Sequence, residues 1–109
     1  MIHELRIYHA LPGRLPKLLA RFREHTTKIW DRLGIRHVGF WTTMVGHSES
    51  NALTYLIAWE SLADRESKWG AFLKDPEWLR VQAESEQDGP INANIDSQLL
   101  TPTDFSRLK

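Results

Sequence analysis

The apolar residues of this chain recur at two different spacings, and the order of the spacings limits the folds it can adopt. Alternation of apolar and polar residues is typical of a half-buried strand, whereas a repeat of three or four residues is typical of an amphipathic helix. The sequence therefore predicts strands at residues 2–10, 36–45, 52–60 and 91–100, and helices at 15–33, from 61 onward, and from 75 to about 86. This order predicts an α+β fold, a ferredoxin-like β-α-β-β-α-β sandwich whose four-stranded antiparallel sheet has helices on one face.

Local signals mark where the predicted elements begin and end. Gly34 supplies the left-handed residue that commonly ends a helix. Ser61 and Asp64 have the spacing of a capping box, and Asp75-Pro76 pairs a favourable N-cap with a residue tolerated in the first helical turn. The polar residues 46–51 predict a hairpin connection between the second and third strands.

A single layer of helices leaves the other face of such a sheet uncovered. Trp41 and the nearly all-apolar third strand both need covering, and five tryptophans are many for the core of one 109-residue domain. Two sheets packed face to face would cover these residues. We therefore expect a homodimer formed through the open sheet face and closed into a dimeric α/β barrel.

Length and composition limit the functional classes. At 109 residues we expect one domain spanning residues 1–109. Fourteen basic residues balance fourteen acidic ones, so neither nucleic acid nor an anionic membrane is an expected partner. The chain has no cysteine, which excludes a disulfide framework and a cysteine nucleophile, and the N-terminus lacks a signal-peptide pattern. We expect a cytoplasmic protein.

Several segments, taken in order, resemble the NIPSNAP family over nearly the whole chain. They are Glu4-Leu-Arg-Ile-Tyr8, Pro12-Gly13, Leu33-Gly-Ile35, Val38-Gly-Phe-Trp41, Gly46, Ala58-Trp-Glu-Ser-Leu-Ala-Asp-Arg65, Asp75-Pro-Glu-Trp78 and Leu100-Thr-Pro-Thr-Asp-Phe-Ser106. The resemblance implies a dimeric α/β barrel. It implies no catalytic residues, because that family is not defined by a settled catalytic set. The related barrel superfamily includes cofactor-free monooxygenases, haem-degrading enzymes and isomerases, so the fold alone decides no activity.

The first strand supplies the main candidates for ligand binding. Glu4, Arg6 and Tyr8 share one face, and in the ferredoxin-like strand order this strand lies beside the fourth, so Arg6 could face Asp96, Asn94 or Gln98. A buried guanidinium can hold a carboxylate or an enolate oxygen. The alternative, which we favour, is a structural ion-pair network that satisfies the barrel interior, because structural networks also bury charged groups and shift their pKa values.

The second strand supplies candidates for catalysis. Simple alternation places His37, Trp41 and Thr43 together on the open face, where an aromatic wall would stand beside a titratable ring. The alternative, which we favour, is that Trp41 fills the dimer interior and His37 lies near the strand end in solvent. The five histidines show no ligand spacing, so we expect no metal and no cofactor.

Three hypotheses follow from these residues. The first is a barrel that binds a small, partly apolar molecule between sheet and helices, with Arg6, Tyr8, Glu4 and Asn94 as polar contacts and Trp41 as a wall. The second is a cofactor-independent monooxygenase or isomerase acting on an aromatic or polyketide-like compound, with His37 or Tyr8 in proton transfer. The third is a non-catalytic structural or interaction domain with a fully packed interior.

Overall fold

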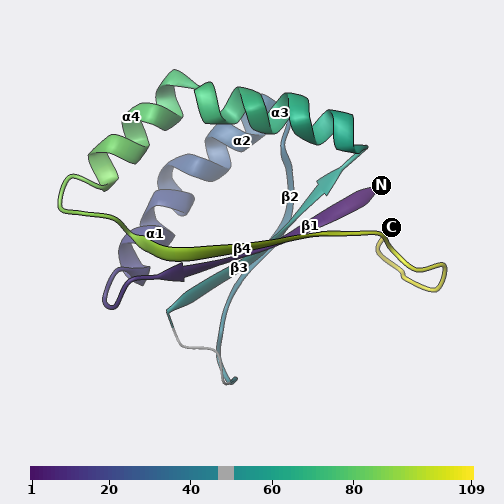
Figure 1. The fold of residues 1–109 in the computed structure, drawn as a ribbon, viewed down its shortest axis with the longest axis horizontal. Helices are drawn as coiled ribbons and strands as arrows, with labels where there is room; N and C mark the ends of the chain where they lie inside the picture. The colour runs from purple at the N-terminus through teal and green to yellow at the C-terminus, as the bar shows by residue number, and fades with distance from the viewer. Residues whose placement is uncertain (47–50) are drawn as a thin grey trace.

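The strands form one antiparallel sheet in the order β2-β3-β1-β4 (Figure 1). A computed structural model describes residues 1–46 and 51–109. The strands are β1 (Ile2–Ala10), β2 (Arg36–Thr42), β3 (Ala52–Trp59) and β4 (Asn92–Leu100). The helices are α1 (Leu15–Arg21), the π-helical turn η1 (Phe22–Thr26), α2 (Thr27–Leu33), α3 (Leu62–Lys74) and α4 (Pro76–Ser85). The predicted ferredoxin-like α+β fold is confirmed.

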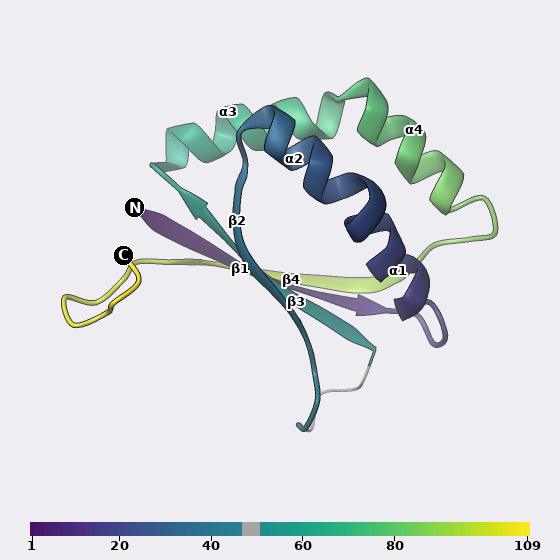
Figure 2. The same cartoon turned by 180° about the vertical axis from the view of Figure 1, so that it is seen from behind.

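All the helices lie on one side of the sheet, as Figures 1 and 2 show from opposite directions. The core fills the space between this helical layer and the sheet. Its largest fully buried side chains include Trp30, Trp59 and Tyr55. Trp30 lies at its centre, with its ring centroid 5.6 Å from that of Phe22 and 5.4 Å from that of Tyr55. Aromatic contacts of this kind add to the burial energy of each ring.

The predicted helix boundaries are confirmed by their caps. Gly34 ends α2 with φ of 76°, a left-handed conformation that glycine adopts without steric cost. Ser61 Oγ accepts a hydrogen bond from the Asp64 amide at 3.1 Å, and the Asp64 carboxylate accepts one from the Glu60 amide at 3.0 Å. Asp75 caps α4 by accepting from the Trp78 amide at 3.0 Å.

The first helical segment differs from the simple helix expected at residues 15–33. It contains the π turn η1 between α1 and α2. Thr26 Oγ1 donates to the Arg21 carbonyl at 3.4 Å, and Thr27 Oγ1 donates to the Phe22 carbonyl at 3.0 Å. A π turn holds more residues than an α turn, so it changes which side chains of the flanking helices face the sheet. Trp30, the fourth residue of α2, is fully buried.

A bulge in β2 places His37 on a different face of the sheet from the one predicted. The pairing with β3 shifts between His37 and Gly39, so Val38 is an extra residue and the alternation reverses there. His37 lies opposite Ile57 on the helix-covered face, 6.1 Å from Trp30 between ring centroids, whereas Trp41 lies opposite Thr54 on the open face. The expectation that His37 and Trp41 share a face is wrong for this reason.

No helix covers the second face of the sheet in the described ranges (Figures 1 and 2). Leu5 pairs with Leu56 at its centre, and Ile7 and Trp41 lie on either side of Thr54. Trp41 is 54% exposed there. The predicted connection at 46–51 falls mostly on residues 47–50, which lie outside the described residues. None of the described helices is long and apolar enough to cross a membrane.

Candidate functional site

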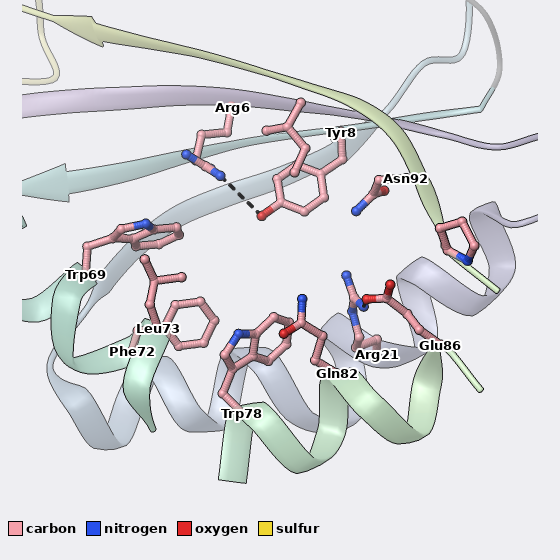
Figure 3. Close-up of a pocket in the computed structure, with 12 residues that line it drawn as sticks. Arg6, Tyr8, Arg21, Trp69, Phe72, Leu73, Trp78, Gln82, Glu86 and Asn92 are labelled. Atoms are coloured by element: carbon pink, nitrogen blue, oxygen red, sulfur yellow. Dashed lines mark hydrogen bonds and ion pairs between the residues drawn. The ribbon is translucent and has the colours of Figure 1, made fainter. Parts of the chain in front are cut away.

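A cavity of about 320 Å³ lies between the sheet and the last two helices (Figure 3). Strands β1 and β4 provide one wall, and α3 and α4 provide the opposite wall. The apolar part of the lining is mostly aromatic, and three charged side chains join it. The lining residues are Arg6, Tyr8, Arg21, Trp69, Phe72, Leu73, Trp78, Gln82, Glu86, Pro90, Asn92 and Ile95.

The cavity exists because the helical layer does not cover the sheet to its edge. Strand β4 is the edge strand beside β1, and Ile95 and Leu99 remain exposed although they lie on the helix-covered side, opposite Tyr8 and Glu4. Leu73 and Gln82 are exposed at the rim on the helical side. A small molecule therefore has a route into the cavity from solvent.

Glu4 forms the centre of a buried polar network behind the cavity. Its carboxylate is 0% exposed and accepts hydrogen bonds from Arg65 Nε at 2.8 Å, Ser97 Oγ at 2.7 Å, Trp59 Nε1 at 3.0 Å and Arg6 Nη1 at 3.0 Å. Burial alone raises the pKa of a carboxyl group, but these donors outweigh it and hold the pKa of Glu4 at about 2. Glu4 is therefore ionised and fully occupied, which leaves it no role as an acid or base toward a ligand.

Arg6 connects this network to the cavity. Its Nε donates to Tyr55 Oη at 2.7 Å and its Nη2 donates to Tyr8 Oη at 3.4 Å, in addition to the bond to Glu4. Burial lowers the pKa of the guanidinium, but the two tyrosines and Glu4 outweigh it and raise the pKa above its ordinary value. A guanidinium has five N–H groups. The three bonds use three of them, so two N–H groups have no partner among the described residues, and Arg6 lines the cavity.

Two tyrosine hydroxyls extend this chain of hydrogen bonds. Tyr55 receives the bond from Arg6 Nε and donates its own proton to Tyr8 Oη at 3.1 Å. Burial, followed by the neighbouring Tyr8, raises the pKa of Tyr55 well above its ordinary value, so its hydroxyl stays protonated. Tyr8 Oη then accepts from both Tyr55 and Arg6, and its own O–H proton is left to donate. Because Tyr8 lines the cavity, this donor is available to a ligand.

Arg21 approaches the cavity from the opposite wall (Figure 3). It comes from the end of α1, is only 5% exposed, and lies over the Trp78 ring with its Cζ atom 5.1 Å from the ring centroid. Its Nη1 donates to Glu86 Oε2 at 3.0 Å and to Ser85 Oγ at 3.3 Å. Within the described part of the chain, Arg21 Nε and Asn92 Oδ1 are buried without a hydrogen-bond partner.

The structure brings together some of the candidate site residues and separates others. Arg6 and Tyr8 line the cavity, and Glu4 holds Arg6 from behind. Trp41 lies on the open face of the sheet and is not part of the cavity wall. His37 also lies away from the cavity, where its Nε2 atom is 2.8 Å from Asp31 Oδ1.

The expected neighbours of Arg6 on β4 need correcting. Arg6 pairs with Ser97, whereas Asp96 pairs with Ile7, Gln98 with Leu5, and Asn94 with His9, all on the open face. A bulge opposite Ala10 inserts Ala93, so Asn92 turns to the cavity side while Asn94 does not. The amide at the cavity is that of Asn92.

Sequence reasoning missed two arginines, although a signal for each was present. Arg65 lies four residues before Trp69 and seven before Phe72, on the same helical stripe. Arg21 lies three residues after Leu18, also on a stripe that faces the core. A cation at such a position requires an anionic partner, and both arginines have one: the buried Glu4 for Arg65 and the partly exposed Glu86 for Arg21.

The site is built for hydrogen bonding and for apolar contact. Across residues 1–46 and 51–109, no three histidine or acidic side chains are placed to hold a metal ion together. The polar groups that face the cavity are cations, hydroxyls and amides, with Glu86 as the single carboxylate among its lining residues. Such a lining suits a small organic anion.

Comparison with known proteins places this architecture in a family. The NIPSNAP family model matches residues 3–107. The chain belongs to the NIPSNAP family. A NIPSNAP family protein from Agrobacterium tumefaciens is 26% identical, with a TM-score of 0.87 and coverage of 99% of this chain and 98% of that chain. An uncharacterized NIPSNAP-like domain protein from Burkholderia xenovorans is 27% identical, with a TM-score of 0.83 and coverage of 96% and 87%.

A more distant likeness extends beyond the NIPSNAP proteins. A putative antibiotic biosynthesis monooxygenase from Nitrosomonas europaea has a TM-score of 0.64 at 8% identity, over 94% of this chain and 98% of that chain. At that identity the likeness shows a shared fold alone. No functionally curated protein matches the chain.

Proposed function

We propose that the protein binds a small, partly apolar anion in the cavity between the sheet and α3 and α4. The observation that carries this proposal is the set of unused hydrogen-bond donors on Arg6 and Tyr8. These two residues form one end of the cavity, which we call the inner end. Arg6 has two spare N–H groups and Tyr8 has a spare O–H, and both line a cavity whose other walls include Trp69, Phe72 and Trp78. A carboxylate or enolate oxygen accepts from both groups.

The electrostatics of the inner end support an anion. Glu4 is the one carboxylate shared by two arginines, Arg6 and Arg65, so this cluster carries an excess positive charge. Its donors are already oriented, since Arg6 is held between Glu4, Tyr55 and the Trp69 ring, 4.7 Å from its Cζ atom. Preorganised donors lose little entropy on binding. The volume of about 320 Å³ is within the range of small-molecule sites.

A calorimetric titration with matched ligands and variants tests the proposal. The ligands are 3-phenylpropanoate and its uncharged amide. Arg6→Gln removes one of the two cations that line the cavity, the one at the proposed anion site. The control Arg65→Gln removes the other cation that pairs with Glu4, which lies outside the cavity. We expect the acid to bind better than the amide, and the preference to disappear in Arg6→Gln but remain in Arg65→Gln. Equal loss in both variants would assign the arginines a structural role only.

The alternatives are less well supported by the geometry. A structural domain with a packed interior would not leave the cavity beside Arg6. For a cofactor-independent monooxygenase or isomerase, Tyr8 lines the cavity but His37 does not. Catalysis would therefore depend on Tyr8, whose hydroxyl would donate to an enolate oxygen in the same position as our proposed carboxylate.

We also propose that two copies associate through the open sheet face. Leu5, Ile7 and Leu56 form an apolar strip there with no helix above it in the described ranges, and Trp41 lies beside them. Aromatic and aliphatic side chains at the centre of a flat face are typical of a subunit interface. Light scattering should give about twice the monomer mass, and a monomer at high concentration would contradict the proposal. One domain over residues 1–109 and a cytoplasmic location stay predictions.

A further inference from the structure

The cavity has a second polar end that the proposed anion site does not use. Arg21 and Glu86 lie at this end on the helical wall, with Asn92 of β4 facing them (Figure 3). Arg21 is 95% buried, since its exposed fraction is 5%, yet its Nε atom has no partner among the described residues. Asn92 Oδ1 is likewise buried without a donor. Buried polar groups are nearly always satisfied, so this pair indicates a missing hydrogen-bonding group.

The two ends of the cavity differ in charge. At the inner end, two arginines share Glu4, which leaves one excess positive charge. At the second end, Arg21 pairs with Glu86, and their charges balance. A second carboxylate placed beside Arg21 would therefore meet the Glu86 carboxylate. A neutral group meets no such repulsion.

A hydroxyl group fits the unused atoms at the second end. It can accept a hydrogen bond from the Arg21 guanidinium and donate one to Asn92 Oδ1. Among the described residues, Arg21 Nε lacks an acceptor and Asn92 Oδ1 lacks a donor. The aromatic rings of Trp69, Phe72 and Trp78 line the helical wall of the same cavity. A flat apolar body therefore suits the space beside them.

We propose that the ligand is a hydroxylated aromatic monoanion, with its carboxylate at Arg6 and Tyr8 and its hydroxyl at Arg21 and Asn92. This rests on the proposed function, because it takes the anion site at Arg6 as given. It adds the chemical class of the ligand. The second end should favour a ring with a neutral hydroxyl over an unsubstituted ring and over a ring with a second carboxylate. A cavity of about 320 Å³ accommodates one such ring with a short acidic side chain.

Isothermal titration with a small set of related probes tests this selection. The probes are 3-phenylpropanoate, its three hydroxyphenyl isomers, 3-(4-carboxyphenyl)propanoate and 4-ethylphenol. We expect at least one hydroxyphenyl isomer to bind about tenfold more tightly than 3-phenylpropanoate, the usual gain from one or two well-placed hydrogen bonds. The diacid should bind more weakly than that isomer.

Two variants distinguish a role of the second end in ligand selection from a role in folding. Asn92→Ala removes the acceptor that lines the cavity, and Asn94→Ala is the matched control because it lies on the same strand but on the open face. The preference for the hydroxyl should disappear in Asn92→Ala and persist in Asn94→Ala. Persistence in both variants would overturn the assignment of the second end.

The possible failures are distinguishable. If the unsubstituted acid binds as tightly as every hydroxylated isomer, or the diacid binds most tightly, the inference is wrong and the anion site at Arg6 stands. If 4-ethylphenol binds as tightly as the acids, the proposed function is wrong. If none of the probes binds at 10 mM, both are wrong.

Discussion

At the centre of β1, the two faces have the opposite character from those of an ordinary half-covered sheet. On the face that the helices cover, this strand carries Glu4, Arg6 and Tyr8, and on the uncovered face it carries Leu5 and Ile7. A sheet covered on one side normally turns its apolar residues to the core and its polar residues to water. Our two proposals, a ligand on the covered face and a second copy on the uncovered face, would each account for one half of this inversion.

The largest expected effect comes from breaking the polar network on the covered face. Glu4→Gln keeps the shape of the side chain but leaves Arg6 and Arg65 without their shared carboxylate. Breaking a buried ion pair costs about 3–5 kcal/mol, and we expect the free energy of unfolding, measured in urea, to fall by this amount.

An exposed ion pair provides the control for this variant. Asp88 binds Arg14 and Lys17 at the surface, and Asp88→Asn should shift the urea midpoint little, because solvent screens such pairs. If Glu4→Gln were as stable as Asp88→Asn, the covered face would contribute nothing to folding, and the contrast between the two faces would lose its energetic basis.

The pH dependence of stability should show the same network. The pKa of Glu4 is about 2 in the folded protein against an ordinary 4.5, so the unfolded chain takes up this proton first as the pH falls. The contribution of Glu4 is complete above pH 4.5 and is lost as the pH falls from 4.5 to 2. We expect a loss of about 3 kcal/mol. Urea midpoints of the wild type should fall more steeply in this window than those of Glu4→Gln; parallel curves would contradict the assignment.

On the uncovered face, a charge should separate the two copies. Trp41→Asp places a carboxylate among apolar residues of the proposed interface, and loss of a central tryptophan costs about 2 kcal/mol of association energy, or some thirtyfold in Kd. Light scattering across a dilution series measures this. The matched control is Leu79→Asp on α4, which is 49% exposed against 54% for Trp41 but lies on the helical side. Equal dissociation in both variants would place the interface elsewhere.

A smaller effect should follow from moving Trp41 instead of removing it. Its ring lies over Gly39, where an added Cβ atom would be 2.8 Å from Trp41 Cη2. Gly39→Ala therefore displaces the ring without adding a charge. We expect dimer dissociation to increase a few-fold, with near-UV circular dichroism reporting the new environment of the ring. Unchanged association would show that the position of Trp41 on this face does not matter.

The sequence predicts the elements of this fold more reliably than the faces they present. Spacing identifies three of the strands and the helices, because a change from alternation to helical spacing depends on many residues at once, and a short apolar run identifies β3. The face of the sheet to which each side chain of a strand points depends on single residues, because one bulge reverses the alternation that follows it. The extra residues Val38 and Ala93 therefore account for the misplacement of His37 relative to Trp41 and of Asn94 relative to Asn92.

The candidate site was predictable in part. Arg6 and Tyr8 could be found because alternation within β1 is uninterrupted from Glu4 to Tyr8. The opposite wall could not be located, since α3 and α4 meet β1 only after the chain has folded. Arg21 is the clearest example. Its spacing from Leu18 indicates that it faces the core, but the orientation of its helix relative to Trp30 depends on the π turn η1, which has no strong sequence signal.

That turn makes the second end of the cavity sensitive to chain length. A helix rotates about 100° with each residue, so deleting one residue from Phe22–Thr26 would swing Arg21 around the axis relative to Trp30. The guanidinium would leave its place over Trp78 although no side chain there had been exchanged. Relatives with a one-residue gap in this stretch should thus retain an acid-binding pocket at Arg6 and accept ligands without the hydroxyl.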